Sequence, residues 1–354
     1  MLGTGPKDAL TDVSGLLVGH HHEIDPAAEL GSGAATGCTV IRALGGAVAA
    51  VDVRGGGPGT RETDLLDPSH SVQQVNAVLL TGGSAYGLAA ADGVMRWLEE
   101  HGHGIAMGSP DQVVPIVPAA VIFDLPVGDW SIRPTADFGY RAAAAARADF
   151  ATGSVGAGVG ARAGVLKGGI GTASTVIEGG PADGVTVGAL IVTNPVGSVF
   201  DPRTGLPWGV GSEGPGAYRM RTPDVHEVWK ANALAPKGTA LNTTIGVVGT
   251  DVDLTAASCK RVAVASHDGL ARAIRPAHSP LDGDTIFALS TGTRKVVTET
   301  AMPKAFSSDL PVLAAVCAVA ADVVERAIVR ALLDATSIAG IATYRQIFPS
   351  AFAP

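Results

Sequence analysis

The chain has 354 residues and a mass of 35.5 kDa, enough for one large domain or two ordinary ones, which excludes a peptide hormone or a disulfide-stapled mini-domain. Apolar residues make up 46% of the chain and charged residues 16%, so long disordered regions are not expected. The net charge of -8 argues against a general nucleic-acid binder, because such a protein needs a basic face to replace phosphate counterions.

Short runs rich in Val, Ile and Leu predict strands, several of which lack clean alternation and are expected to be buried on both faces. In chain order these strands are 16–18, 38–42, 48–53, 77–80, 119–123, 185–192, 244–248 and 285–289. Helices are predicted over 85–101, 136–148, 254–274 and 310–335. Because strands and helices mix without a strict βαβ rhythm, we expect two packed sheets covered by helices.

Cys38, Cys259 and Cys317 are far apart, odd in number and set among small or apolar neighbours, a pattern typical of buried free thiols. A reducing cytosol suits such thiols, and the N-terminal residues show no secretory signal, so we expect a cytoplasmic protein. The longest apolar stretch, 310–321, is shorter than the roughly 20 residues that a membrane span needs. We interpret it as a buried helix and expect no membrane association.

Glycine accounts for 47 of the 354 residues, nearly twice the usual share of about 7%, and it gathers in clusters without a repeat. The clusters lie at 55–59, 82–83, 153–171 and 205–216. Because glycine allows close backbone approach and positive φ, clusters that follow apolar strands predict turns crowded around a site. For 205–216 a flexible linker is an equally good interpretation.

Standard catalytic motifs are absent from the sequence, which contains no GxSxG, HExxH, CxxC or P-loop pattern. The stretch GSVGAGVG at 153–160 is followed by a poor helix former, which argues against dinucleotide binding. His20, His21 and His22 are consecutive, and consecutive side chains on a strand point to opposite faces. We therefore interpret them as a solvated strand end and not as a zinc site.

The segment 233–241, ALAPKGTAL, predicts a loop of small residues that runs into Asn242, Thr243 and Thr244 and then into the strand IGVVG. A hydroxyl residue that follows an adaptable loop at the start of a buried strand is a position where an N-terminal nucleophile can be made. An ordinary strand end is the alternative interpretation of Thr243.

Asp282 and Asp284 flank a glycine in HSPLDGDTIFAL, at 278–289. In an extended conformation the two carboxylates share a face, where they either perturb each other's pKa or hold a hydroxyl and an amine in place. A solvated turn is the alternative interpretation. His267 and His278 are isolated in the sequence and are interpreted as ordinary structural histidines.

Six segments, in order along nearly the whole chain, carry a resemblance to a known family. They are VRGGGPGTRETDLL at 53–66, LLTGGSAYGLAAADGV at 79–94, KGGIGTAS at 167–174, TNPVGSVFD at 193–201, NTTIGVV at 242–248 and DGDTIFAL at 282–289. Together they resemble the L-aminopeptidase D-esterase (DmpA-like) family, which includes β-peptidyl aminopeptidases and the nylon-oligomer hydrolase. The NTT and DGD elements look closest to the nylon-oligomer hydrolase branch.

The resemblance implies a four-layer αββα sandwich in a single domain, a fold that is also similar to the ornithine acetyltransferases. It implies a precursor that cuts itself between Asn242 and Thr243. The products are an α chain of residues 1–242 and a β chain of residues 243–354 that begins with the nucleophile.

The resemblance also implies the other site residues. The family's catalytic lysine matches Lys167, its asparagine matches Asn194, and its paired acidic or hydroxyl positions match Asp282 and Asp284. A family tyrosine near the oxyanion matches Phe123, so that hydroxyl is missing here. This departure bears on the oxyanion arrangement and on the range of substrates.

We therefore predict a self-processing amidohydrolase or aminopeptidase that acts on small peptides, amides or esters through a Thr243 acyl-enzyme. The α-amine freed by the cut, with an ordinary pKa near 8, can serve as the base, tuned by Lys167 and the carboxylates, while Asn194 donates to the oxyanion. We expect no metal, organic cofactor, nucleic acid or membrane partner, and a homo-oligomer of αβ units. The alternatives are acyl transfer to an amine acceptor, and an unprocessed binding protein on the same scaffold.

Overall fold

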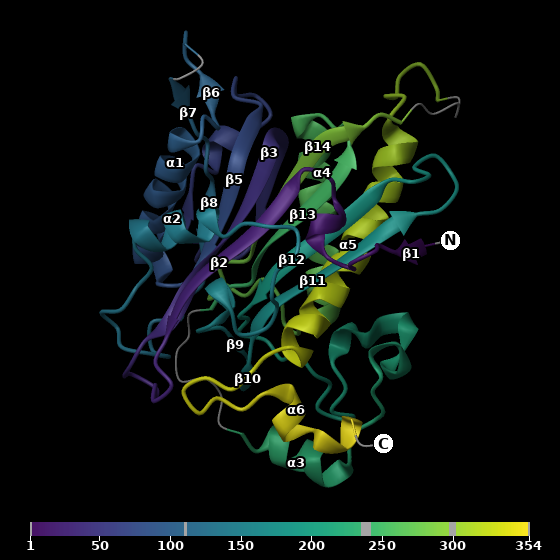
Figure 1. The fold of residues 1–354 in the computed structure, drawn as a ribbon. Helices are drawn as coiled ribbons and strands as arrows, with labels where there is room; N and C mark the ends of the chain where they lie inside the picture. The colour runs from purple at the N-terminus through teal and green to yellow at the C-terminus, as the bar shows by residue number, and fades with distance from the viewer. Residues whose placement is uncertain (1, 110–111, 235–241, 297–301, 353–354) are drawn as a thin grey trace.

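A computed structural model describes residues 2–109, 112–234, 242–296 and 302–352 (Figure 1). Its main sheet has ten strands in the order β1-β11-β12-β13-β14-β3-β5-β8-β4, and β2 pairs with β3 off this path. The pairs β13–β14 and β5–β8 are parallel, and the other pairs of this sheet are antiparallel. The strands of the main sheet are β1 (Leu2–Thr4), β2 (Leu16–Ile24), β3 (Ala35–Val53), β4 (Thr60–Arg61), β5 (Gln74–Thr81), β8 (Ala119–Val121), β11 (Gly169–Ile177), β12 (Thr186–Thr193), β13 (Ile245–Val252) and β14 (Thr285–Arg294).

Two short hairpins and six α-helices complete the described part of the chain. The hairpins are β6 (Ile105–Ala106) with β7 (Val113–Val114) and β9 (Arg162–Ala163) with β10 (Leu166–Lys167). The helices are α1 (Ala90–Glu100), α2 (Ala136–Ala144), α3 (Val225–Asn232), α4 (Ala256–Ala273), α5 (Leu310–Leu333) and α6 (Tyr344–Ile347). In this part of the chain none of the helices combines the length and apolar composition that a membrane crossing requires.

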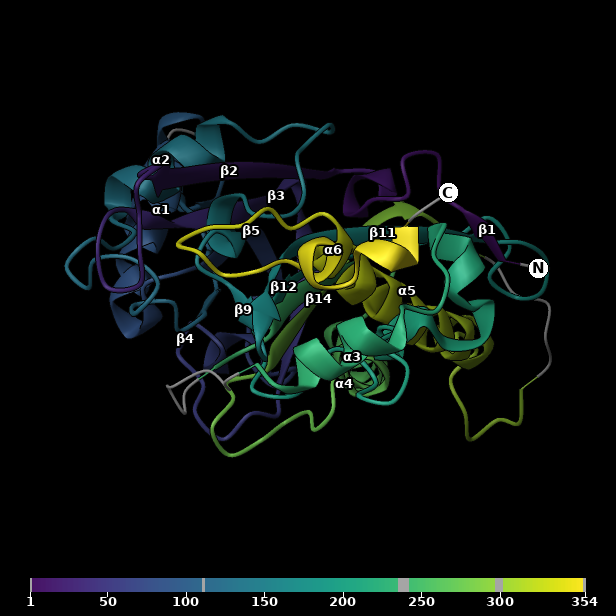
Figure 2. The same cartoon turned by 90° about the horizontal axis from the view of Figure 1, so that it is seen from below.

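Three buried apolar clusters separate four layers, and Figures 1 and 2 show α1 and α2 on the side of the sheet away from α4 and α5. Neighbouring residues of one strand enter different clusters because side chains alternate across a strand. On β3, Val40 packs against α1 and α2, whereas Ile41 enters the middle cluster. On β12, Leu190 enters the middle cluster and Ile191 packs toward α4 and α5. The predicted helix–sheet–sheet–helix order is confirmed.

The two β layers are joined through one long strand. β3 pairs with β2 over its first half and with β14 over its second half, and its register against β5 shifts between Arg42 and Ala47. The sequence predicted two separate strands here, 38–42 and 48–53, which is wrong. Gly45 and Gly46 lie within this irregularity, and Gly46 has a φ of 78°. This glycine pair bends the strand and does not end it.

The glycine-rich segment 153–171 hides a strand that the sequence did not predict. β11 lies between the short edge strand β1 and β12 in the β-layer that packs against α5, and its Gly171 faces the helix backbone. A Cβ at Gly171 would lie 1.9 Å from the carbonyl oxygen of Ala327 and 2.4 Å from the amide nitrogen of Ala331. Glycine is therefore used here for close packing of a helix on a strand, not only for turns.

The four predicted helices are confirmed, with shorter ends. The range 85–101 divides into a 3-10 turn at Ser84–Ala89 followed by α1, and the range 136–148 ends at Ala144. The segment 205–216, for which a linker and a site turn were equally good interpretations, contains two 3-10 turns, Trp208–Glu213 and Pro215–Tyr218. The predicted loop 235–241 lies outside the described residues.

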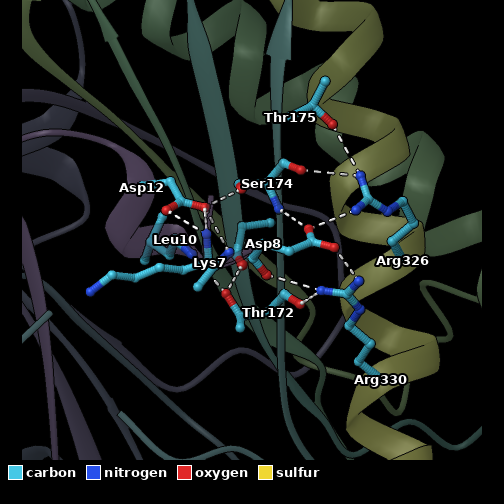
Figure 3. Close-up of polar contacts among 11 residues, drawn as sticks. Lys7, Asp8, Leu10, Asp12, Thr172, Ser174, Thr175, Arg326 and Arg330 are labelled. Atoms are coloured by element: carbon cyan, nitrogen blue, oxygen red, sulfur yellow. Dashed lines mark hydrogen bonds and ion pairs between the residues drawn. The ribbon is translucent and has the colours of Figure 1, made fainter. Parts of the chain in front are cut away.

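The N-terminal segment is fixed to the far end of the chain by an ionic contact that we call the Asp8 clamp, formed by Asp8, Arg326 and Arg330 (Figure 3). Asp8 Oδ1 accepts from Arg326 Nη2 at 2.6 Å and from the amide of Ser174 at 2.8 Å, and Oδ2 accepts from Arg330 Nη2. Arg330 also donates to the carbonyl oxygens of Asp8 and Thr172, at 2.9 and 3.1 Å. The clamp therefore ties the N-terminus to both β11 and α5.

Substitution of Gly171 by alanine should destabilise the protein, because the backbone of α5 cannot yield as a side chain would. We expect the free energy of unfolding to fall by about 2 kcal/mol or more, at the upper part of the range for overpacked cores. Gly45→Ala is the matched control, because its Cβ would meet nothing within 4 Å, and it should change stability by less than about 1 kcal/mol. Urea unfolding of both variants checks this, and equal effects would contradict it.

Candidate active site

Thr243 lies in the short stretch between Asn242 and the start of β13, and it is only 4% exposed. Its amide donates to the carbonyl oxygen of Asn194 at 3.0 Å. Its hydroxyl donates to the carbonyl oxygen of Asn242, which belongs to the peptide bond that Thr243 itself follows. The hydroxyl therefore lies beside the peptide bond between Asn242 and Thr243, which is the bond that a nucleophile at this position would attack.

The same carbonyl of Asn242 accepts a second hydrogen bond, from the amide of Gly283 at 3.0 Å. Gly283 has no room for a side chain, since its Cβ would lie 2.8 Å from both Thr243 Oγ1 and the carbonyl oxygen of Gly57. Gly55 is similarly close to the DGD turn, with its Cβ position 2.3 Å from the carbonyl oxygen of Asp282. The glycine cluster at 55–59 is therefore a turn crowded around the site, as predicted.

Asp282 is buried, and its main chain bridges to Asn242, the residue before Thr243. Its Oδ1 accepts from the amide of Val196 at 3.1 Å, and within the described structure its Oδ2 has no hydrogen-bond partner. Burial, followed by the negative charge of Asp284, raises the pKa of Asp282 to about 6. This carboxyl is therefore able to take up and release a proton near neutral pH.

Asp284 is equally buried but is surrounded by donors. Its Oδ1 accepts from the amide of Thr244 at 2.8 Å, and its Oδ2 accepts from the amide and the Nδ1 of His278 at 3.0 and 2.9 Å. Three N–H groups are therefore directed at the one carboxyl group of Asp284. The two aspartates are thus both buried but differ in their surroundings, and the solvated-turn interpretation is wrong.

Asn194 connects this group to the neighbouring strand β12. Its main-chain carbonyl accepts from Thr243, and its side-chain Oδ1 accepts from the amide of Arg162 at 2.8 Å. The latter bond fixes the orientation of the amide group, since the oxygen faces Arg162 and the nitrogen faces away from it.

Lys167 is fully buried, and its ammonium lies in a cradle of main-chain oxygens. It donates to the carbonyls of Gly158, Ala161 and Gly168 at 2.8, 3.0 and 2.7 Å. Lys167 pairs with Arg162 in the β9–β10 hairpin, and Arg162 in turn binds Asn194. Among the predicted site residues, Thr243, Asn242, Asp282 and Asp284 are brought together directly, whereas these contacts link Lys167 to them through Asn194.

The structure also places Phe123 and the run of three histidines that begins at His20. Phe123 is partly buried and packs edge-on against Trp130, with ring centroids 6.2 Å apart. His20 is not a solvated strand end, because its ring nitrogens contact Thr39 Oγ1 at 2.9 Å and the carbonyl oxygen of Ala151 at 3.1 Å. His22 accepts from the amide of Gly156 at 3.2 Å, so these histidines fix the loop that follows residue 150.

The sequence analysis missed the partner of Asp284. His267 and His278 are eleven positions apart in the sequence, but their rings lie 4.8 Å apart and edge-on. The ring of His278 contacts Asp284 directly. The available signal was that His278 lies only four residues before the DGD turn. Sequence periodicity does not predict that the loop folds so that His278 reaches Asp284.

A cavity of about 310 Å³ opens beside Asn242. Its described lining is largely apolar and comes from β9, the segment 196–202 and the end of α3, with the residues Ala163, Gly164, Val165, Val196, Ser198, Val199, Phe200, Pro202, Ala231, Asn232 and Leu234. No group of three or more His, Cys, Asp or Glu residues in the described ranges has the arrangement of a metal site. Cys38, Cys259 and Cys317 are free thiols, and Cys317 is only partly buried.

Comparison with known proteins agrees with this site. The family model of peptidase family S58 matches residues 8–345, so the chain belongs to that family. An uncharacterized aminopeptidase of Mycobacterium tuberculosis is 57% identical, over 98% of this chain and 99% of that protein. A 6-aminohexanoate-oligomer endohydrolase of a Kocuria species is 32% identical, over 81% of this chain and 76% of that protein.

Solved structures with the same fold include two aminopeptidases. A Burkholderia β-aminopeptidase matches with a TM-score of 0.71 and 24% identity, over 98% of this chain and 93% of that chain. The L-aminopeptidase D-Ala-esterase/amidase of Ochrobactrum anthropi, a variant of the N-terminal nucleophile hydrolase fold, matches with a TM-score of 0.70 and 24% identity, over 95% and 88%. The predicted fold and the predicted class, an aminopeptidase or amidohydrolase, are confirmed. Neither the acyltransferase nor the binding-protein alternative gains support.

The environment of Asp282 leads to a pH-dependent stability. Its pKa is raised from 3.8 to about 6 by folding, so its contribution to stability is complete below pH 3.8 and is lost as the pH rises through 6. Asp282→Asn, which cannot ionise, should therefore raise the free energy of unfolding at pH 8 by about 1–3 kcal/mol and have little effect near pH 4. Urea unfolding in a Thr243→Ala background measures this, and a gain that is the same at both pH values would contradict it.

Proposed function

We propose that this chain is a precursor that cuts itself between Asn242 and Thr243 and then works as an amide hydrolase with Thr243 as its nucleophile. The observation that carries the proposal is the contact of the Thr243 hydroxyl with the Asn242 carbonyl, which also accepts from Gly283. The products are an α chain of residues 1–242 and a β chain of residues 243–354.

In the first reaction Thr243 Oγ attacks the carbonyl carbon of Asn242. The proton of the hydroxyl passes through one water to Asp282, whose raised pKa suits proton transfer near neutral pH, and the amide of Gly283 stabilises the developing oxyanion. The proton then moves to the amide nitrogen of Thr243 as the C–N bond breaks, which leaves an ester. The same bond breakage frees the α-amine of Thr243, and water then hydrolyses the ester, which releases the carboxyl group of Asn242 and restores the Thr243 hydroxyl.

In the second reaction the new α-amine of Thr243 acts as the base for its own hydroxyl, because a free threonine hydroxyl is a weak nucleophile. The attack forms an acyl-enzyme on a substrate amide or ester, and water then releases the acyl group. Asn194 is the proposed side-chain donor to the oxyanion, and the buried charges of Asp284 and Lys167 tune the amine.

Small peptides, amides and esters are the proposed substrates. The largely apolar cavity beside Asn242 is of the size that holds a small ligand. Relatives of this chain are named as an aminopeptidase and as an oligomer endohydrolase of 6-aminohexanoate, and both names denote hydrolysis of amide bonds.

Thr243→Ala should abolish the cut, because the same hydroxyl is needed for the attack. The variant should remain one folded chain of 35.5 kDa without amidase activity, whereas the parent should give two bands and a small chain whose N-terminal sequence is Thr-Thr-Ile-Gly. Intact mass, N-terminal sequencing and hydrolysis of alanine p-nitroanilide measure this. An active enzyme that remains one chain, or a cut retained in Thr243→Ala, would contradict the mechanism.

We also propose that the αβ units form a closed homo-oligomer in the cytoplasm. The three free thiols suit a reducing compartment, and closed symmetry is the usual arrangement of enzymes of this size. Sedimentation at micromolar concentration should give a mass of two or more units of 35.5 kDa. A mass of one αβ unit would contradict the oligomer.

A further inference from the structure

Behind the carboxyl group of Asp284 lie two histidines that the proposed mechanism does not use. His278 comes from the loop before β14, and His267 comes from α4 and is fully buried. The Nε2 of His267 contacts the carbonyl oxygen of Asp52 at 3.0 Å, and its ring packs edge-on against that of His278. Asp52 is paired in turn with Arg54 and Lys260, at 2.8 Å each.

The partners of the two rings determine their protonation. His267 donates from Nε2 because a main-chain carbonyl only accepts, and burial lowers the pKa of this ring to about 4, so it is neutral at physiological pH. His278 donates from Nδ1 to Asp284, while its Nε2 is buried without a partner in the described structure. An N–H at that Nε2 would be unsatisfied, so Nδ1 is the ring nitrogen of His278 that the hydrogen bonds assign as donor.

The backbone at His278 is shaped for this contact. Its φ is 57°, in the left-handed region that is uncommon for residues other than glycine, although asparagine, aspartate and histidine are enriched there. In this conformation both the main-chain amide and the ring Nδ1 of His278 reach Oδ2 of Asp284. A strained residue that places two donors on one buried carboxylate oxygen is typical of a functional site.

The other oxygen of Asp284 carries the effect to the nucleophile. It accepts from the amide of Thr244, the residue that follows Thr243. His278 therefore holds Asp284 in one orientation, and Asp284 holds the backbone amide of Thr244.

We propose that His278 is a positioning residue that keeps Asp284 oriented toward Thr244, the residue that follows the nucleophile. This inference rests on the function proposed above. The ionisable groups that face the pair are Asp282 on the same loop, His267 on α4, and beyond it Asp52 and Arg54 at the end of β3 and Lys260 on α4.

Two substitutions separate the donor from the backbone conformation. Glycine and asparagine both accept a left-handed φ, but only asparagine retains an N–H donor near the position of the histidine Nδ1. His278→Gly therefore removes the side-chain donor, and His278→Asn keeps it. His70→Asn, at an exposed histidine outside the site, is the matched control.

The rate of the cut is followed for each variant after cell-free synthesis, at pH values from 5.5 to 8.5, together with hydrolysis of alanine p-nitroanilide. Loss of the side-chain donor leaves the Asp284 carboxyl group free to turn away from Thr244, so both rates should fall by about tenfold in His278→Gly, as expected for the loss of one hydrogen bond to such a group. His278→Asn and His70→Asn should keep the parent profile. A merely structural role of the loop would lower the rates of His278→Gly and His278→Asn equally.

Equal profiles for the glycine and asparagine variants would overturn the role of His278 while leaving the proposed function intact. A parent that makes no Thr243-dependent cut and hydrolyses no amide would instead overturn the proposed function. Nitrogen NMR of the imidazoles in intact Thr243→Ala needs no change at His278, and it should show a proton on Nδ1 and none on Nε2 between pH 6 and 8. A proton on Nε2 in that range would also overturn the inference.

Discussion

The parallel pairing of β13 and β14 is the constraint on which the site depends. The pairing continues upstream of both strands, where Asn242 bridges to Asp282 and the amide of Thr285 donates to the carbonyl oxygen of Thr244 at 3.1 Å. Because the two strands run in the same direction, their entering loops meet at one edge of the sheet. The candidate nucleophile and Asp284, about forty positions apart in the sequence, therefore meet at one backbone segment, where Asp284 accepts from the amide of Thr244, while Asp282 bridges to Asn242 through the main chain.

That arrangement places three ionisable groups, Lys167, Asp282 and Asp284, where water does not reach them. Each is accommodated in a different way: main-chain carbonyls surround the ammonium, N–H groups surround one carboxylate, and the other carboxyl has its pKa raised. The glycine-rich loops make this possible, because their main-chain groups approach closely enough to replace water. The close packing of the glycine-rich loops therefore explains both the high glycine content of the chain and the burial of three ionisable groups at this place.

Much of the site could be predicted from residue types whose chemistry is recognisable from short stretches of sequence. Thr243 at a loop-to-strand boundary and the carboxylates on either side of Gly283 are local patterns, and the structure places them together. β11 was missed because glycines such as Gly171 remove the Val and Ile signal of a strand, although close contact with α5 requires them. His278 was missed because its partner His267 is brought to it only by the packing of α4 on the sheet.

The Asp8 clamp has a consequence for what a cut can do to the molecule. Asp8 lies before residue 242, whereas Arg326 and Arg330 lie after it, and the same is true of the pairings of β12 with β13 and of β3 with β14. Two fragments joined at several distant points separate only if all the contacts open together, so each contact keeps the others at high effective concentration. Breakage of one peptide bond at residue 242 would change the covalent connectivity of the chain while its topology in space persists. The N-terminal arm would act as a non-covalent tie between the two pieces.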